Sequence, residues 1–152
     1  MRKRLIRGSM QAVLGALAFC ARRPALNPLT AWLTRSLALV TVRAKRIGVA
    51  ATVEELGPLW QRSFPAKKQV PIERVSGNTV YAQIHTPCPL RGSGDTQACH
   101  RMMQYDREVL DRAGGQFVVL ESQATPGRTH CRVAMRMKGE TIDDLPPAHL
   151  KH

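Results

Sequence analysis

Two cysteines and two histidines frame one Gly-rich segment of this sequence, HTPCPLRGSGDTQACH (residues 85–100). Cys88 and Cys99 stand on either side of a loop that carries Arg91. Thiol, imidazole and guanidinium groups this close in sequence suggest a metal site or a nucleophilic thiol. The opposing interpretation is that the cysteines are small hydrophobic core residues, a common role for free thiols.

A tetrahedral zinc site is the first chemistry that these residue types permit, because zinc takes thiolate, imidazole and carboxylate ligands. Cys99 lies on the apolar face of a predicted helix, and Cys131 lies on the apolar face of a predicted strand. We expect Glu121 to point inward as well, since it is in phase with Phe117 and Val119. An inward carboxylate is costly unless it is paired or binds a cation. The candidate zinc ligands are Cys99, Glu121 and Cys131, with Cys88, His100 or His130 as the source of a fourth bond.

A thiol nucleophile is the second possibility, and Cys88 is the candidate. Arg91 lies close in sequence, and its charge would favour the reactive thiolate. His85 is the nearest candidate base. Asp106 lies on the apolar face of the helix after the loop and is a further candidate. For the histidines and the acidic residues alike, the alternative is a solvent-facing side chain or an ion pair with a neighbouring arginine.

The elements that must position these residues form an α+β unit. Alternation of apolar and polar residues predicts a strand after the Ser-Gly-Asn turn at 76–78 and two more over 116–122 and 131–137. A helix is expected from Asp95 or Thr96 as N-cap to Arg112. The sequence therefore predicts an antiparallel sheet with a helix packed on it. Such a sheet leaves one face exposed, which makes a homodimer a reasonable expectation.

The basic residues are concentrated in the N-terminal third of the chain. Residues 1–50 hold ten Lys and Arg and no acidic residue, whereas all 11 acidic residues follow, and the net charge is +12. Two helices are expected in this part of the chain, over the stretch that ends near Ala21 and over about 29–46, and a third, short helix is expected after it, over 53–62. Their apolar positions are Ile6, Met10, Val13, Leu14 and Leu17 in the first helix and Trp32, Leu33, Leu37 and Val40 in the second.

These basic amphipathic helices have two main interpretations. They pack on their own domain, or they lie on an anionic membrane surface that attracts their arginines. A cleaved signal peptide is a third interpretation, although Phe19 stands where a small residue is wanted. Nucleic acid is not the expected partner, because the basic region has no helix-turn-helix signature and no aromatic stacking platform.

Three regions are expected from these patterns: a basic helical region (1–50), an α+β small-molecule domain (51–140) and a flexible tail (141–152). The tail is polar and contains prolines, which is typical of frayed chain ends. The expected location is the cytoplasm, with peripheral attachment to the inner membrane as an option.

Residues of about 50–138 also resemble a known family. The pattern comprises CP-L at 88–90, a cysteine and an aspartate on one helix (Cys99 and Asp106), ES-Q at 121–123, and G-x-x-x-C at 127–131. It is similar to the L-2-amino-thiazoline-4-carboxylic acid hydrolases, which in turn resemble the 4-vinyl-reductase-like ligand-binding domains. The resemblance implies a 4-vinyl-reductase-like fold.

The hydrolase resemblance implies hydrolytic opening of a cyclic thiazoline carboxylate. The positions that match its pattern are Cys88, Cys99, Asp106 and Cys131. From the residue types, the candidate catalytic residues are Cys88, Asp106 and Glu121, and the substrate would contact Arg91, Cys99 and His100. The vinyl-reductase-like domains imply a zinc site of one glutamate and three cysteines. Cys99, Glu121 and Cys131 match three of its positions, but Ala124 occupies the fourth.

Three functions are therefore expected, in this order. The first is a small-molecule hydrolase, and the second is a non-enzymatic ligand-binding or metal-binding sensory domain on the same fold. The third is a membrane-surface accessory protein that acts through its basic helices.

Overall fold

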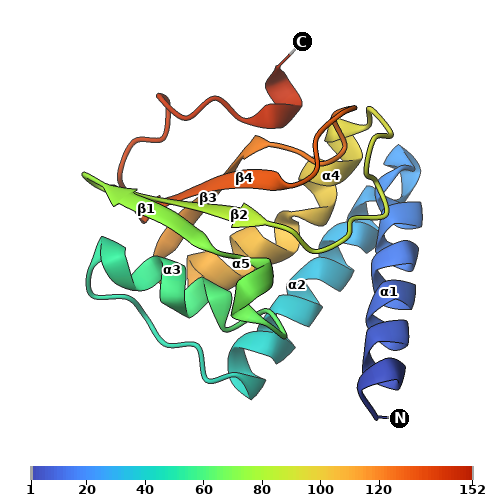
Figure 1. The fold of residues 1–152 in the computed structure, drawn as a ribbon, viewed down its shortest axis with the longest axis horizontal. Helices are drawn as coiled ribbons and strands as arrows, with labels where there is room; N and C mark the ends of the chain where they lie inside the picture. Colours follow the sequence, from blue (N-terminus) through green and yellow to red (C-terminus); the bar gives the residue numbers. More distant parts are fainter. Residues whose placement is uncertain (1, 152) are drawn as a thin grey trace.

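The structure is a computed structural model that describes the backbone of residues 2–151 and side chains from residue 11 onward. Over that range, four antiparallel strands form one sheet in the order β1-β2-β4-β3 (Figure 1). The strands are β1 (Ile72–Ser76), β2 (Thr79–Ile84), β3 (Gly115–Glu121) and β4 (Cys131–Met137). The α-helices are α1 (Arg2–Ala21), α2 (Asn27–Ala44), α3 (Val53–Gln61), α4 (Thr96–Met102) and α5 (Gln104–Arg112). The predicted α+β class is confirmed.

The main core lies between the inner face of the sheet and the helices α3 and α5. Alternating apolar residues of the strands meet the apolar faces of these two helices, and burial of this surface is the main driving force for folding. The fully buried members include Leu56 and Trp60 of α3, Val109 and Leu110 of α5, and Val133 and Met135 of β4. Helix α2 packs against α5, and α1 packs against α4 (Figure 1).

Local signals place several of these elements. The Asp95 side chain accepts a hydrogen bond from the backbone N–H of Ala98 at 2.8 Å and so caps α4 as predicted. Gly114, with φ of 83°, follows the end of α5. Gly77, with φ of 57°, lies in the turn between β1 and β2, where the turn was predicted.

Two elements differ from the prediction. The single helix expected over 96–112 is two helices, α4 and α5, that meet at Met103. The two helices differ in their main packing partners, since α4 lies mainly against α1 whereas α5 lies mainly against α2 and β3. Strand β1 was not predicted, because its C-terminal residues are exposed on both faces and show no alternation.

The expected flexible tail is a packed segment in the structure. Ile142 and Leu145 cover the outer face of the sheet against Val118 and Ala134. This is the face whose exposure suggested a dimer. The short helix η3 (Ala148–Leu150) then reaches β3 and α4.

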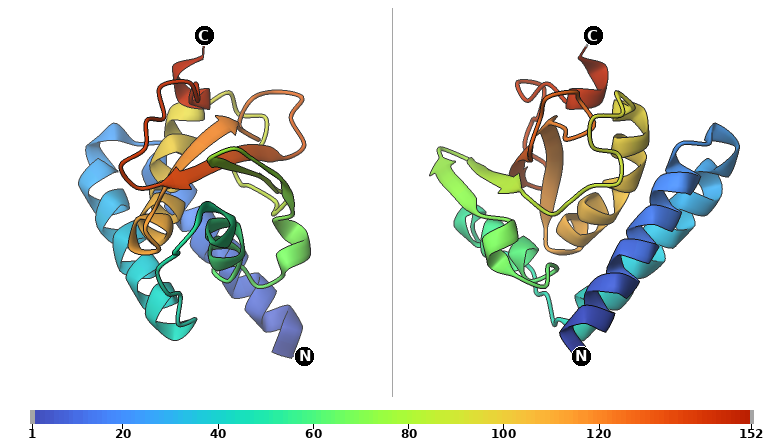
Figure 2. Two further views of the ribbon diagram at one scale, coloured as in Figure 1. Left: turned by 90° about the vertical axis from the view of Figure 1, so that its left-hand side faces the viewer. Right: turned by 45° about the vertical axis from the view of Figure 1, so that its right-hand side comes forward.

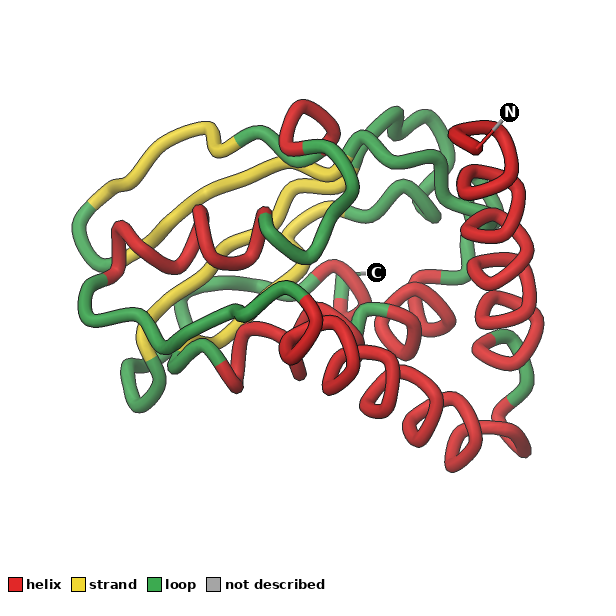
Figure 3. Tube along the Cα trace, turned by 90° about the horizontal axis from the view of Figure 1, so that it is seen from below, coloured by secondary structure: helices red, strands yellow, loops and turns green. Residues whose placement is uncertain are grey.

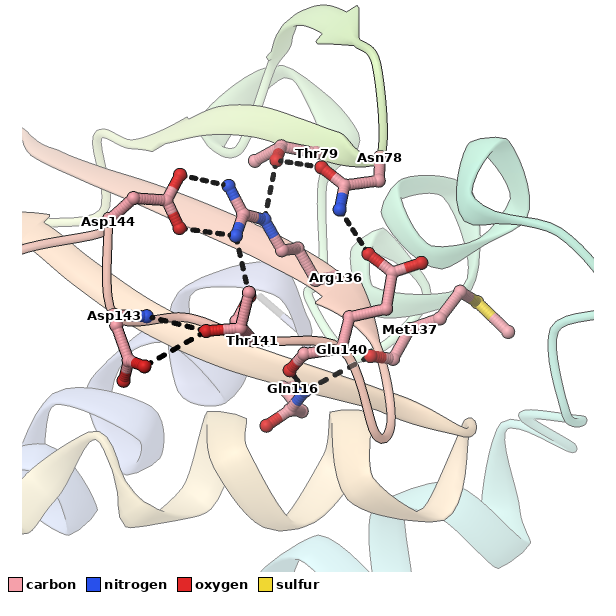
Figure 4. Close-up of polar contacts among 9 residues, drawn as sticks. All are labelled: Asn78, Thr79, Gln116, Arg136, Met137, Glu140, Thr141, Asp143 and Asp144. Carbon is pink, nitrogen blue, oxygen red and sulfur yellow. Dashed lines mark hydrogen bonds and ion pairs between the residues drawn. The ribbon is translucent and has the colours of Figure 1, made fainter.

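A buried arginine holds this segment to the sheet (Figure 4). Arg136 of β4 is only 5% exposed. Its Nε donates to the Thr79 hydroxyl at 2.7 Å, and its two Nη atoms bind both carboxylate oxygens of Asp144 at 2.6 and 2.7 Å. A further bond, of 2.6 Å, reaches the backbone carbonyl of Thr141. The composition of the tail does not reveal this contact, because its partner Arg136 lies on β4, outside the tail.

We expect the Asp144→Asn variant to unfold several degrees below the wild type, because Asn cannot provide two charged acceptors to the buried Arg136 guanidinium. Limited proteolysis should also cut the tail of the variant faster. Asp143→Asn is the matched control, since Asp143 is exposed and, among the described residues, its carboxylate accepts a hydrogen bond from Thr141 alone. Equal melting temperatures for the two variants would contradict this account of the tail.

Candidate functional site

The four cysteines all lie within the described residues, and none of them forms a disulfide. Cys99 is buried in a small apolar cluster, with the half-buried Cys88 against it. Ala18 and Ala21 of α1 belong to the same cluster. The cysteines that frame the Gly-rich loop therefore help to fasten α1 to the domain.

Cys131 is buried in the main core, with its Sγ accepting a hydrogen bond of 3.3 Å from the backbone N–H of Gln123. The inward orientation predicted for Cys99 and Cys131 is confirmed. Burial raises the pKa of Cys99 to about 11 and that of Cys131 to about 12, and it also raises the pKa of Cys88. All three thiols are thus protonated at neutral pH, which makes them poor nucleophiles.

Glu121 does not point toward the thiols, so the prediction of an inward carboxylate is wrong. The register of β3 against β4 shifts between Val119 and Glu121, which is a β-bulge at Leu120. Because of the extra residue, Glu121 pairs with Arg132 instead of continuing the face of Val119. Its carboxylate lies 2.9 Å from Arg128 and 3.7 Å from Arg132.

The predicted zinc ligands are therefore not assembled. Glu121 is neutralised by arginines, and it lies on the opposite face of the sheet from Cys131, the residue before its partner Arg132. Ala124, at the fourth family position, is fully buried and has no donor atom. Throughout the part of the chain that the structure describes, no three His, Cys, Asp or Glu side chains could hold a metal ion. The arrangement does not fit the implied zinc site.

Asp106 has a structural partner instead of a place in a cleft. Its Oδ1 accepts a hydrogen bond of 2.8 Å from the indole N–H of Trp60, and the residue is 5% exposed. Burial raises the pKa of Asp106 to about 6, although the Trp60 bond and the charge of Arg107 act in the opposite direction. The alternative expected for Asp106, an ion pair with a neighbouring arginine, is not what the described residues show, because its side-chain partner is the neutral indole of Trp60.

Arg91 also has a structural partner, the buried side chain of Gln123. Its Nε and Nη2 both donate to Oε1 of Gln123, at 2.9 and 2.7 Å. Gln123 is buried, and its amide N–H groups bind the carbonyls of Ile84 and Thr86, both at 3.1 Å. The side chain of Arg91 therefore joins the cysteine loop to the end of β3.

Two of the predicted site residues border cavities: Glu121 borders one of about 330 Å³, where Arg128 neutralises it, and His100 borders another. A cleft of about 430 Å³ lies between α4 and α5, the free edge of β3 and the C-terminal segment. The residues that matter for its chemistry are His100, Arg107, Phe117, Val119, Leu145 and His149. Most of its exposed lining is apolar, and the polar groups of α4, α5 and η3 gather on one wall.

A compact polar group forms that wall. The ring centroids of His100 and His149 are 3.7 Å apart. Arg107 donates from Nη2 to the His100 carbonyl at 2.6 Å, and its Nη1 lies 3.4 Å from Nδ1 of His100. A third bond, of 3.0 Å, joins its Nε to Gln104. The guanidinium has five N–H donors, so two are left for a ligand.

The charge of this wall comes from the arginine. Burial, together with the nearby charge of Arg107, lowers the pKa of His100 to about 4. Burial also lowers the pKa of His149, with Arg107 again contributing. Both imidazoles are thus neutral at pH 7, and Arg107 carries the positive charge. The carboxylate of Asp143 also borders the cleft.

Sequence reasoning missed Arg107 and His149. Arg107 lies seven residues after His100, a spacing that places two residues on one helix face, so that signal was present. No comparable signal exists for His149, because only the folded tail brings it to α4. The three predicted catalytic residues lie in different places. Cys88 packs in the cluster beside α1, Asp106 is in the main core, and Glu121 pairs with Arg128 and Arg132.

Comparisons of the chain with protein-family models, with curated proteins and with solved structures found no match.

We predict that the Asp106→Asn variant gains stability relative to the wild type as the pH rises from about 4 to 7. The raised pKa means that the folded wild type binds more protons than the unfolded chain between 3.8 and about 6, so its stability falls through that window. Asn cannot ionise and still accepts from Trp60. The gain should be about 3 kcal/mol at most, since one pKa unit corresponds to about 1.4 kcal/mol.

Urea unfolding of both proteins across this pH range measures the difference. Trp60→Phe is the companion variant: it removes the donor that lowers the pKa of Asp106, so its loss of stability should extend to higher pH. A stability difference between Asp106→Asn and wild type that is the same at both ends of the range would refute the prediction.

Proposed function

We propose that this chain is a small-molecule-binding domain whose ligand is an apolar molecule with a carboxylate. The observation that carries the proposal is the cleft beside β3, which combines apolar walls with one half-buried cation, Arg107. Its volume of about 430 Å³ falls within the range of about 300–1,000 Å³ that is usual for ligand pockets. A ligand-binding role is also what the resemblance to the 4-vinyl-reductase-like domains implies.

The two ends of such a ligand have different partners. Phe117 and Val119 of β3 and Leu145 of the tail offer apolar surface to its body. Arg107 offers two N–H donors to its carboxylate, and a charge-assisted bond of this kind is about twice as strong as a neutral one. Neutral His100 and His149 add polar contacts without adding charge.

A hydrolytic function has less support. The three candidate catalytic residues lie in different parts of the molecule, where Asp106 binds Trp60 and Glu121 pairs with Arg128. Burial also raises the pKa of the Cys88 thiol, which is therefore protonated. Opening of an aminothiazoline carboxylate stays a prediction from the resemblance. That molecule is itself a small carboxylate, so it belongs among the probes of the cleft, with its turnover followed in the same samples.

Titration calorimetry with octanoate and 3-phenylpropionate tests the proposal. We expect both probes to bind, and we expect propionate, which lacks the apolar body, to bind far more weakly. Arg107→Gln should weaken binding by about tenfold to a hundredfold, the loss expected for a hydrogen bond to a charged group. His100→Gln should have a smaller effect.

The matched control is Arg112→Gln, which removes an exposed charge of the same helix outside the cleft. Circular dichroism of each variant checks that it is folded. If neither probe binds the wild type at millimolar concentration, or if Arg107→Gln binds as tightly as Arg112→Gln, the proposed function is wrong.

A further inference from the structure

Helix α2 exposes its apolar side. Trp32 and Val40 are each 63% exposed, and Leu29 and Leu37 are 44% and 39% exposed. With the half-buried Leu33, these residues recur at three- and four-residue spacing, which makes one continuous stripe along the helix. The sequence predicted this apolar spacing but not the direction in which it faces.

The opposite side of α2 is small and polar, and it is buried. Thr30, Thr34 and Ala38 are at most 1% exposed. Each threonine hydroxyl bonds back to its own helix, from Thr30 to the carbonyl of Leu26 at 3.0 Å and from Thr34 to that of Thr30 at 2.8 Å. Such bonds satisfy the hydroxyls in the interior, and the small side chains permit close packing on α5. The packing itself therefore turns the apolar stripe outward.

Helix α1 adds to the same flank of the molecule. It is anchored near its C-terminal end, where Ala18 and Ala21 are buried and Arg101 of α4 donates to the Ala21 carbonyl at 2.8 Å. Val13 and Phe19, in contrast, are 47% and 56% exposed. Figures 2 and 3 show α1 and α2 along the side of the molecule away from the strands. The side chains of Ile6 and Met10, predicted on the apolar face of α1, lie outside the described residues.

Exposed cations stand at both ends of the apolar stripe. Arg22 and Arg23 lie at the turn before α2, and Arg43, Lys45 and Arg46 lie at its C-terminal end. No acidic residue occurs within residues 1–50 to neutralise them. An apolar stripe with cations at both ends matches an anionic lipid surface, where apolar side chains enter the acyl boundary and long basic side chains reach the phosphates.

We propose that the flank formed by α1 and α2 binds an anionic lipid bilayer, with α2 lying in the plane of the interface. Trp32, Leu37 and Val40 insert below the headgroups, and the basic residues at each end bind lipid phosphates. Among residues 2–151, no helix is long and apolar enough to cross a bilayer, so the helices lie on the surface and not across it.

Charge favours lipid over the other possible occupants. A second copy of the chain would bring two acid-free basic surfaces together, and like charges oppose such an interface. Nucleic acid would satisfy the cations but would leave the apolar stripe against phosphates and water. The surface shares no residue with the cleft beside β3, so the proposal does not depend on the proposed ligand.

Tryptophan fluorescence gives a direct readout, because the chain has two tryptophans with opposite exposure. Trp32 is 63% exposed, whereas Trp60 is fully buried in the core. We expect vesicles of phosphatidylglycerol and phosphatidylcholine to shift the tryptophan emission of the 152-residue chain to shorter wavelength. In the Trp32→Phe variant the shift should vanish, while co-sedimentation with the vesicles should persist.

Charge removal tests the electrostatic part. A triple variant, Arg43→Gln, Lys45→Gln and Arg46→Gln, should partition about a hundredfold more weakly, since each basic residue near an anionic surface contributes roughly fivefold. The matched control removes three exposed cations elsewhere: Arg62→Gln, Lys67→Gln and Lys68→Gln. It should bind vesicles like the wild type. Replacing Trp32 and Val40 with Ser should also abolish binding without unfolding the protein.

Several outcomes would overturn the proposal. One is equal affinity for vesicles of pure phosphatidylcholine, and another is equal binding by the two charge variants. A blue shift of Trp32 that follows protein concentration without vesicles would assign the stripe to a second copy. Tighter retention on DNA than on anionic vesicles, lost in the triple variant, would assign the basic residues to nucleic acid.

Discussion

The hydrogen bond between the Trp60 indole and the Asp106 carboxylate joins the two helices that cover the sheet. Trp60 is fully buried, and its ring contacts Phe64 and Phe117 at centroid distances of 5.0 and 5.8 Å. Burying a carboxylate is unfavourable, as its raised pKa indicates, yet an unpaired buried indole N–H would also cost free energy. The bond therefore fixes α3 against α5 with little freedom for either helix to slide.

Helix α5 in turn positions one wall of the cleft and the packing of α2. Arg107 follows Asp106 directly, so the helix that presents one residue to the core presents the next to the cleft. On another side, α5 receives the small residues of α2. Tyr105, one residue before Asp106, bonds the Thr41 hydroxyl of α2 at 3.2 Å. Three consecutive residues of α5 thus contact three regions: Tyr105 contacts α2, Asp106 lies in the core, and Arg107 borders the cleft.

The spacing of apolar residues predicted those elements of secondary structure that depend on local sequence. The helices, the turn at 76–78 and three of the strands follow from the spacing of apolar residues and from Gly and Asp signals. The inward direction of Cys99 and Cys131 follows in the same way. Glu121 breaks the pattern, because a bulge adds one residue and so exchanges the faces of the strand. Nothing in the local sequence marks that bulge.

The candidate site could be predicted only in part, for a related reason. His100 and Arg107 are seven residues apart in the helix predicted over 96–112, so their proximity could be predicted, but His149 joins them through a tail that was expected to be flexible. Cysteines that are neighbours in sequence suggested a site, whereas burial makes them part of the core. Long-range packing determines which polar groups meet, and these long-range contacts cannot be inferred from the local patterns of a single sequence.

Helix α4 shows how closely the two candidate surfaces are connected. Cys99 packs against α1, whereas the next residue, His100, borders the cleft. Arg101 then holds the last turn of α1 through the Ala21 carbonyl. Because consecutive residues of one short helix face both regions, α1 cannot move on its anchor without disturbing the wall that holds His100. The C-terminal end of α2 meets α5 through the bond between Thr41 and Tyr105. The side chains of Arg43, Lys45 and Arg46 are exposed, however, so substitutions of these three residues act on the basic flank while leaving the cleft intact.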